Sequence, residues 1–204
     1  MWNLDSGRYL KSLFGHEDSV WALAISSRGK IVSGSGDRTV KIWNVEGALC
    51  IKSLRGHKFA VRSLAVAPAT GHIISGSDDE QIRVWDLEQD GECVRVLDTA
   101  ETTAEASAAG AGGLHAGSVR ALAVTAAGNI LLSAADNRQI RVWDLQSGQC
   151  LKTLLAHTLG VMSLAICANT DVSSKKQELA FVSGSRDHTI KVWSLKIDNK
   201  AADC

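Results

Sequence analysis

The chain has 204 residues, with 45% hydrophobic residues and 22 Lys and Arg against 22 Asp and Glu, so its formal net charge is zero. Proteins that hold nucleic acid by its phosphates carry an excess of positive charge, and this balance makes DNA or RNA an unfavoured partner. No apolar run approaches the roughly 20 residues that a membrane-spanning helix needs, and no basic-then-apolar signal segment opens the chain. These features favour an intracellular protein of the cytoplasm or nucleus without a membrane partner.

A repeat runs along the chain and is marked first by tryptophans. Trp2, Trp43, Trp85, Trp143 and Trp193 lie 41, 42, 58 and 50 residues apart. A His-x-x-x-Val unit begins at His16, His57, His115 and His157, and the next Trp in this series follows after 27, 28, 28 and 36 residues. Two insertions, one before the third unit and one inside the fourth, explain the irregular spacings. The period of about 40 residues indicates a repeat architecture.

Each unit contains short apolar and β-branched runs separated by Gly, Asp and Ser, which predict strands. In the first unit the four runs are 20–25, 31–35, 39–43 and 49–54. Four strands in a period of about 40 residues are typical of a β-propeller blade rather than of a helical solenoid. The sequence therefore predicts an all-β fold of four-stranded antiparallel blades, about four of which are present.

The repeat divides the chain into predicted segments. Residues 1–14 are the remnant of a preceding blade with an outer strand, and the four repeats occupy 15–54, 56–97, 114–154 and 156–195. The insertion at 98–113, DTAETTAEASAAGAGG, has too few large side chains to fold alone, so we expect a flexible acidic loop on the upper face. Residues 168–178 form a second loop on the opposite face, and 196–204 form a tail.

Dipeptide signatures accompany the repeat. Two units contain Trp-Asp, at Trp85-Asp86 and Trp143-Asp144, and two contain Gly-His, at Gly15-His16 and Gly56-His57. Trp43-Asn44 and Trp193-Ser194 depart from the first signature. With these marks over nearly its whole length, the chain resembles the WD-repeat β-propeller family.

The resemblance implies a structural hydrogen-bond tetrad of His, Ser, Asp and Trp in each blade. By position the members are His16, Ser33, Asp37 and Trp43; His57, Ser75, Asp79 and Trp85; His115, Ser133, Asn137 and Trp143; and His157, Ser183, Asp187 and Trp193. Buried polar groups of this kind must find partners when blades pack face to face. Asn137 replaces the acid in the third unit, so we expect a neutral and weaker bond there.

Ser, His and Asp together also suggest a hydrolase triad, which needs one exposed nucleophile and an oxyanion hole. Here the trio occurs in three of the four units, with Asn in place of Asp in the third, always with a fixed Trp, which indicates a scaffold and no enzyme. Cys50, Cys93 and Cys150 fall at one recurring position, and we interpret them, with Cys167, as small buried side chains. We predict no cofactor and no metal.

The resemblance also implies where partners bind, because loops and strand mouths carry recognition in propellers. The residues after the repeated Val are Trp21, Arg62, Arg120 and Met162, and three that precede the tetrad acid or its replacement are Asp78, Asp136 and Arg186. Trp and Arg are common in binding hot spots. The three arginines are similar to the pattern by which F-box-type WD-repeat receptors read phosphorylated peptides. The plainer interpretation is that they pair with Asp78 and Asp136 on a solvated rim.

Residues 2–7 match 143–148, so the chain opens at the end of a third strand, and no clear fourth strand follows Trp193. Residues 8–14 are candidates for that missing strand. Since the resemblance implies mostly seven-bladed rings, we expect part of a longer array. Exposed blade faces would then favour self-association or pairing with another propeller segment.

The predicted function is a non-catalytic scaffold or adaptor that binds other proteins or peptides through the upper face. One alternative is a substrate receptor of a ubiquitin-ligase-type complex that reads acidic or phosphorylated peptides. A second alternative is the propeller part of a longer enzyme. Partner and pathway are not specified by the sequence.

Overall fold

The computed structural model describes residues 5–26, 28–86, 91–97, 117–167 and 177–197. These residues form β-strands joined by turns and loops, and no helix long and apolar enough to cross a membrane occurs among them. The inserted loop predicted at 98–113, with His115 just after it, and most of the loop predicted at 168–178 lie outside the described residues.

The strands form four antiparallel sheets, each a propeller blade. Blade 1 contains β1 (Val20–Ile25), β2 (Ile31–Ser35), β3 (Val40–Asn44) and β4 (Leu49–Leu54). Blade 2 contains β5 (Val61–Val66), β6 (Ile73–Ser77), β7 (Ile82–Asp86) and β8 (Glu92–Leu97). Blade 3 contains β9 (Val119–Val124), β10 (Ile130–Ala135), β11 (Gln139–Asp144) and β12 (Cys150–Leu155). Blade 4 contains β13 (Val161–Ile166), β14 (Gln177–Ser185) and β15 (Ile190–Ile197).

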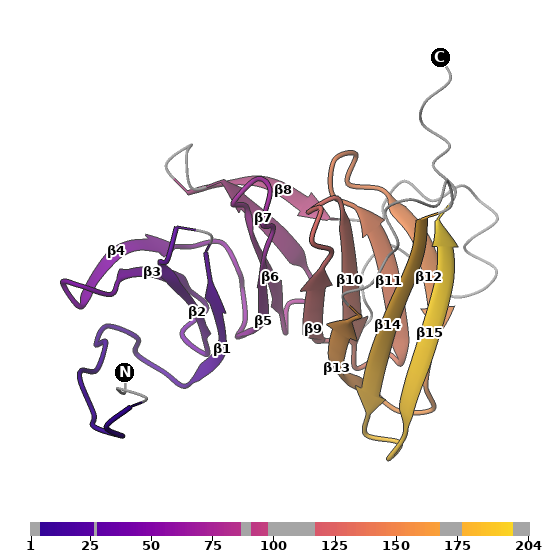
Figure 1. Cartoon of the computed structure of the whole chain (residues 1–204), viewed down its shortest axis with the longest axis horizontal. Coiled ribbons are helices and arrows are strands. Elements are labelled where there is room, and N and C mark those ends of the chain that lie inside the picture. Colours follow the sequence, from indigo (N-terminus) through magenta and orange to yellow (C-terminus); the bar gives the residue numbers. More distant parts are fainter. Residues whose placement is uncertain (1–4, 27, 87–90, 98–116, 168–176, 198–204) are drawn as a thin grey trace.

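The prediction of an all-β propeller is confirmed, with the third strand of the first unit beginning one residue later than expected. Within each blade the strands pair in chain order, and the first strands of consecutive blades, β1, β5, β9 and β13, contact one another. Figure 1 shows the blades following one another along an open arc, from blade 1 in purple to blade 4 in orange and yellow. The amino-terminal segment lies at the blade 1 end of that arc.

Three apolar cores hold the arc together, and each lies between two consecutive blades. The core between blades 1 and 2 is typical: Val40 and Ile42 of blade 1 pack with Val61, Ile73 and Trp85 of blade 2. We call the blade surface that bears Val40 and Ile42 the forward face, and the surface that bears Val61 and Trp85 the rear face. The same forward-to-rear packing recurs between blades 2 and 3 and between blades 3 and 4. Burial of these apolar side chains stabilises the array by roughly 25 cal/mol for each Å² removed from water.

The turns between the second and third strands share one conformation that the tetrad acid or its Asn replacement helps to fix. Asp37 Oδ1 accepts a hydrogen bond from the backbone N–H of Thr39 at 2.9 Å, and Asp79 Oδ1 accepts one from Gln81 at 3.0 Å. The residue that follows has a positive φ in every blade: Arg38 (69°), Glu80 (68°), Arg138 (71°) and His188 (66°). The short polar side chain thus replaces the backbone partners that a tight turn lacks. We call the end of the blades that holds these turns the upper face.

The cysteine prediction needs correction. Cys50 is exposed, whereas Cys93 and Cys150 at the same position of the next two blades are partly buried in the cores between blades. The reason is that this position lies on the rear face, which is covered only where a preceding blade packs against it. Cys167 is also exposed.

Candidate functional site

The tetrad side chains of blade 2 form one continuous hydrogen-bonded chain from the core to the upper face. The indole N–H of Trp85 donates to Ser75 Oγ at 2.8 Å, and Ser75 Oγ lies 2.7 Å from His57 Nε2. His57 Nδ1 lies 2.8 Å from Asp79 Oδ2. With the imidazole proton on Nδ1, every donor in this chain meets an acceptor.

Blades 1 and 4 have the same arrangement. Their His-to-Asp distances are 2.6 Å for His16 and Asp37 and 2.9 Å for His157 and Asp187, and the Trp N–H donates to Ser33 or Ser183 at 2.7 or 2.8 Å. In blade 3 the structure brings together Trp143 and Ser133, at 2.7 Å. Its Asn137 hydrogen-bonds Gln139 through both side-chain atoms, and His115 lies outside the described residues.

Burial prevents the tetrad serines from acting as nucleophiles. Ser33, Ser75, Ser133 and Ser183 are between 0% and 3% exposed, and each hydroxyl oxygen already accepts a hydrogen bond from a tryptophan. A nucleophile must reach a substrate carbon and stand beside donors for the oxyanion. The trio therefore serves the scaffold.

The tetrad acids carry their charge well below neutral pH. Burial raises the pKa of the Asp79 carboxyl, but hydrogen bonds from His57 and from the backbone N–H groups of Lys58 and Gln81 outweigh it and hold the pKa below the usual range. The pKa of Asp187 is lowered mainly by the hydroxyl of Thr189, and that of Asp37 is lowered by Thr39 and His16 against a burial penalty. Each carboxylate thus ties a loop to the turn that follows its second strand.

A second set of side chains forms a line across the inner edge of the upper face, which we call the rim ladder: Trp21, Arg62, Asp78, Arg120, Asp136 and Arg186. The Arg62 guanidinium carbon lies 4.2 Å from the centre of the Trp21 ring, a cation–π contact between blades 1 and 2. Arg62 also pairs with Asp78 at 2.7 Å. Arg62 is thereby held between Trp21 and Asp78.

The rim ladder continues across blades 3 and 4. Arg120 hydrogen-bonds Asp136 through Nε and Nη2, at 2.9 and 2.6 Å, and its Nη1 lies 3.7 Å from Asp78 of blade 2. Arg186 of blade 4 reaches Asp136 of blade 3 at 3.8 Å while its side chain remains 57% exposed. The ladder therefore links all four blades through side chains that the sequence placed at the rim.

Charge pairing shifts the pKa values of Arg120 and Asp78. The carboxylate of Asp136 raises the pKa of the Arg120 guanidinium by accepting its hydrogen bonds. Burial raises the pKa of Asp78, but Arg62, Ser118 and the positive charge of Arg120 outweigh it and lower the pKa. Ser118 was not anticipated from the sequence, since nothing in a repeat marks which loop residue reaches a carboxylate of the preceding blade.

Exposed apolar side chains accompany the ladder on the upper face. Trp21 is 54% exposed, and Met162, at the matching position of blade 4, is half-buried. Sequence reasoning missed Phe59 and Leu159, which are 60% and 51% exposed and follow the tetrad histidine by two residues. Their shared position was the signal that could have identified them. A polar groove of about 490 Å³ lies between the upper loops of blades 1 and 2 and includes Glu17, Arg38 and Arg55.

Comparison with known proteins agrees with this geometry. A family model described as WD domain, G-beta repeat, matches residues 7–44, 48–86, 114–144 and 148–194. The chain therefore belongs to the WD-repeat family, whose members generally act as interaction scaffolds rather than as catalysts.

Curated relatives share only part of their length with the chain. Mitochondrial division protein 1 of Neurospora crassa is 36% identical over 81 residues, which are 40% of this chain and 11% of that protein. WD repeat-containing protein pop1 of Schizosaccharomyces pombe is 32% identical over 84 residues, covering 33% and 11%. The human WD repeat and SOCS box-containing protein 1 is 35% identical over 69 residues, covering 34% and 15%.

A solved structure is similar over most of the chain. The crystal structure of the computationally designed Ika4 protein has a TM-score of 0.71 and 30% sequence identity, covering 93% of this chain and 99% of that chain.

Proposed function

We propose that the chain is a non-catalytic scaffold that binds other proteins through the upper face of its blades. The observation that carries this proposal is Trp21, which is 54% exposed and held in place by the Arg62 guanidinium over its ring. Large aromatic side chains with few rotatable bonds dominate binding hot spots because little conformational entropy is lost when they are covered. Phe59 and Leu159 extend the apolar surface around the same face.

The rim ladder supports this proposal by keeping the surface rigid before a partner arrives. Its arginines and aspartates are already paired at 2.6 to 3.8 Å, so they need not be reorganised on binding. A preorganised surface loses less freedom on association and binds more tightly for the same contacts. Paired charges around an apolar centre are also the usual composition of a polar interface rim.

Quantitative affinity capture from an extract of the source organism tests the proposal. The tagged chain is compared with Trp21→Ala, Phe59→Ala and a control, Glu46→Ala, in an exposed turn at the opposite end of blade 1. We expect a common set of proteins to be depleted several-fold with Trp21→Ala and Phe59→Ala and retained with the control. Equal recovery with all four proteins would remove the upper face as the binding surface.

A second candidate is a receptor for acidic or phosphorylated segments, supported by Arg186. This guanidinium is the most exposed of the ladder, and Asp136, its one acidic neighbour among the described residues, is as far away as 3.8 Å, so it can accept a further anion. Arg62 and Arg120 support the candidate less, because Asp78 and Asp136 already occupy their forks. This difference makes general protein binding the first proposal.

Fluorescence anisotropy with a phosphoserine peptide and its unphosphorylated twin separates the two candidates. A receptor for phosphorylated segments should bind the phosphopeptide and lose at least about tenfold in affinity with Arg186→Glu, a difference of about 1.4 kcal/mol. Arg28→Glu, at an exposed position on the lower loops, should leave binding unchanged. Equal affinity for the two peptides, or no effect of Arg186→Glu, would exclude this candidate.

A further inference from the structure

The two ends of the arc expose blade faces that are buried everywhere else in the molecule. On the forward face, Ile190 and Val192 of blade 4 are 79% and 77% exposed. The residues at the same positions of the other blades are Val40, Ile82 and Ile140, and Ile42, Val84 and Val142, all between 0% and 5% exposed. These two side chains thus occupy positions that are buried in the other three blades, but in blade 4 no neighbouring blade covers them.

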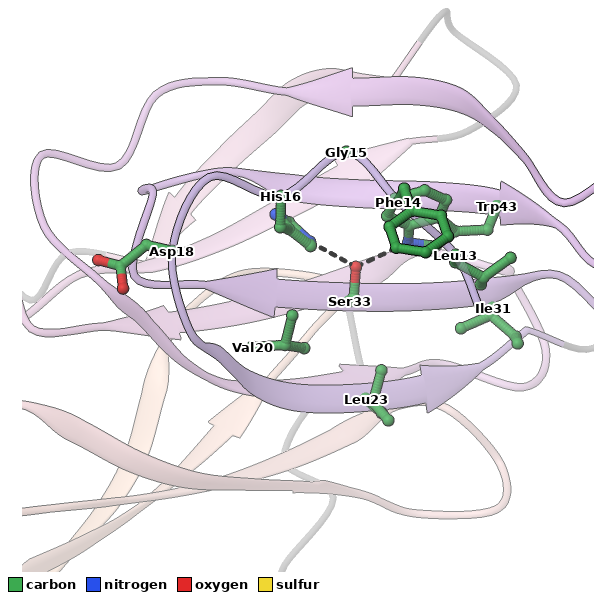
Figure 2. Close-up of a pocket in the computed structure, with 10 residues that line it drawn as sticks. All are labelled: Leu13, Phe14, Gly15, His16, Asp18, Val20, Leu23, Ile31, Ser33 and Trp43. Carbon is green, nitrogen blue, oxygen red and sulfur yellow. Dashed lines mark hydrogen bonds between the residues drawn. The ribbon is translucent and has the colours of Figure 1, made fainter. Parts of the chain in front are cut away.

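The rear face of blade 1 likewise has apolar side chains that no neighbouring blade covers. Val20, Leu23 and Ile25 are 49%, 69% and 74% exposed. The valines equivalent to Val20, which are Val61, Val119 and Val161, are fully buried. A hollow of about 290 Å³ lies on this face, lined by Val20, Leu23, Ile31 and Trp43 among others (Figure 2). In the next two blades the matching surface receives Val40 and Ile42, or Ile82 and Val84.

The two end faces also carry the donor and the acceptor of a hydrogen bond that joins blades 2 and 3 elsewhere in the chain. Ser63 of blade 2 donates from Oγ to the carbonyl oxygen of Val119 in blade 3 at 3.0 Å. Ser163 holds the same position in blade 4 and is exposed. Its hydroxyl lies close to Gly184 on the neighbouring strand, just as the hydroxyl of Ser63 lies close to Gly76. The carbonyl that Ser163 would meet in a further blade corresponds to that of Val20.

The rim supplies a third match. Asp78 of blade 2 contacts Arg120 of blade 3 at 3.7 Å, and the corresponding positions at the two ends of the arc are Arg186 and Trp21. A guanidinium against an indole is an attractive pair, as the contact of Arg62 with Trp21 shows in this chain.

The amino-terminal segment is positioned as the outer strand of a blade that precedes blade 1. Its Lys11-Ser12-Leu13 repeats Lys52-Ser53-Leu54 of β4. Lys11 donates to the carbonyl oxygens of Val45 and Glu46 at 3.1 and 2.9 Å, as Arg95 of β8 does to those of Leu145 and Gln146 of the following blade at 3.3 and 2.9 Å.

At the other end, blade 4 lacks an outer strand in the part of it that the structure describes. There β15 pairs with β14 and has no second strand neighbour, whereas β3, β7 and β11 each pair with a fourth strand. Among the residues that the structure describes, no strand lies on this side of β15, and such a strand edge is a template for one more strand.

We propose that two copies of this chain join head to tail into a closed ring of eight blades. The forward face of blade 4 in each copy packs on the rear face of blade 1 in the other, and residues 8–14 of each copy pair with β15 of its partner as the fourth strand of blade 4. Head-to-tail contacts form a closed ring when the rotations between successive copies add up to a full turn. Eight blades lie within the range of known propellers. Each copy completes a blade that its partner leaves open.

Light scattering coupled to size-exclusion chromatography tests this proposal on the 204-residue chain. We expect twice the single-chain mass of 21.7 kDa. Val192→Glu and Leu23→Lys should each give the single-chain mass, because either change places a charge in both junctions of the ring. Leu155→Arg, at an 82% exposed position where blade 1 already has Arg55, should keep the double mass.

Mixing the two variants distinguishes the head-to-tail ring from a symmetric pairing of like faces. A mixture of Val192→Glu and Leu23→Lys should recover the double mass, because one junction is then unaltered and the other joins opposite charges. If only one variant alters the mass, a like face pairs with itself and the proposal fails. A single-chain mass for the unaltered protein, or open chains of increasing length, would also overturn it.

Folding of the variants is checked by circular dichroism. Because Val192 and Leu23 are 77% and 69% exposed in one copy, we expect both variants to keep the β-sheet spectrum. Should Leu23→Lys not fold, Ile25→Lys, at a 74% exposed position of the same face, replaces it.

Discussion

At the scale of single residues, stability depends on polar groups that are buried with their partners. Ser75 is the clearest example, because its hydroxyl oxygen lies between Trp85 and His57, which are 2% and 7% exposed. A buried donor or acceptor without a partner costs roughly 1–3 kcal/mol. The tetrad therefore stabilises the fold mainly because loss of one member leaves the buried polar atoms of the others without hydrogen-bond partners.

Ser75→Ala should lower the free energy of unfolding by about 2–4 kcal/mol, since it leaves the Trp85 N–H and His57 Nε2 without partners. Ser147→Ala, in an exposed turn of blade 3, is the control and should change it by less than about 0.5 kcal/mol. Denaturant unfolding at one protein concentration measures both. Equal stability of the two variants would show that the tetrad hydroxyl contributes no more than a surface hydroxyl.

Asp79→Asn should change how stability depends on pH. The pKa of Asp79 is lower in the folded protein than its unfolded value of about 3.9, so its contribution is complete above that value and is lost as pH falls below it. We expect the variant to be less stable than the unaltered chain at pH 7, and the difference to shrink below about pH 4. Unfolding measured from pH 7 to pH 3 checks this. A difference that stays constant through the acid range would contradict the role given to the carboxylate.

At the scale of elements, packing between blades decides which apolar residues contribute to the stability of the fold. Leu132 of β10 is fully buried in the core between blades 3 and 4, whereas Leu155 at the end of β12 is 82% exposed. The same residue type therefore stabilises the fold in one place and contributes little in the other.

Leu132→Ala should lower the free energy of unfolding by about 2–5 kcal/mol, through lost burial and the cavity left behind. Leu155→Ala is the matched control and should cost less than about 0.5 kcal/mol. Thermal or denaturant unfolding gives both values. A cost at Leu155 similar to that at Leu132 would mean that the face carrying Leu155 is covered in solution.

Much of each blade could be predicted because contacts within a blade follow the repeat. The strands, the tetrad positions and the rim positions of Arg62 and Arg120 lie at nearly the same offsets from the His-x-x-x-Val unit in the first three repeats, and one insertion accounts for the larger offsets in the fourth. Contacts between blades are different, because they depend on how far one sheet is rotated from the next. The approach of Arg120 to Asp78 of the preceding blade and the exposure of Cys50 therefore emerge only from the structure.

At the scale of the whole molecule, the arc has three kinds of surface with different tasks. Tetrads and cores hold the blades, the two end faces expose side chains that equivalent blades bury, and the upper face presents an apolar centre within paired charges. The upper face is the surface best suited to bind a partner, because Trp21, Phe59 and Leu159 stay exposed where the neighbouring charges are already paired.

Site-specific photo-cross-linking tests the central claim, that the upper face contacts partner proteins, most directly. A photoreactive phenylalanine analogue replaces Phe59, which is 60% exposed on the upper face, or Leu151, which is 47% exposed on the outer strand of blade 3. We expect discrete higher-mass adducts to other proteins from position 59 and few from position 151. Adducts of equal yield from the two positions, or from position 151 alone, would contradict the claim.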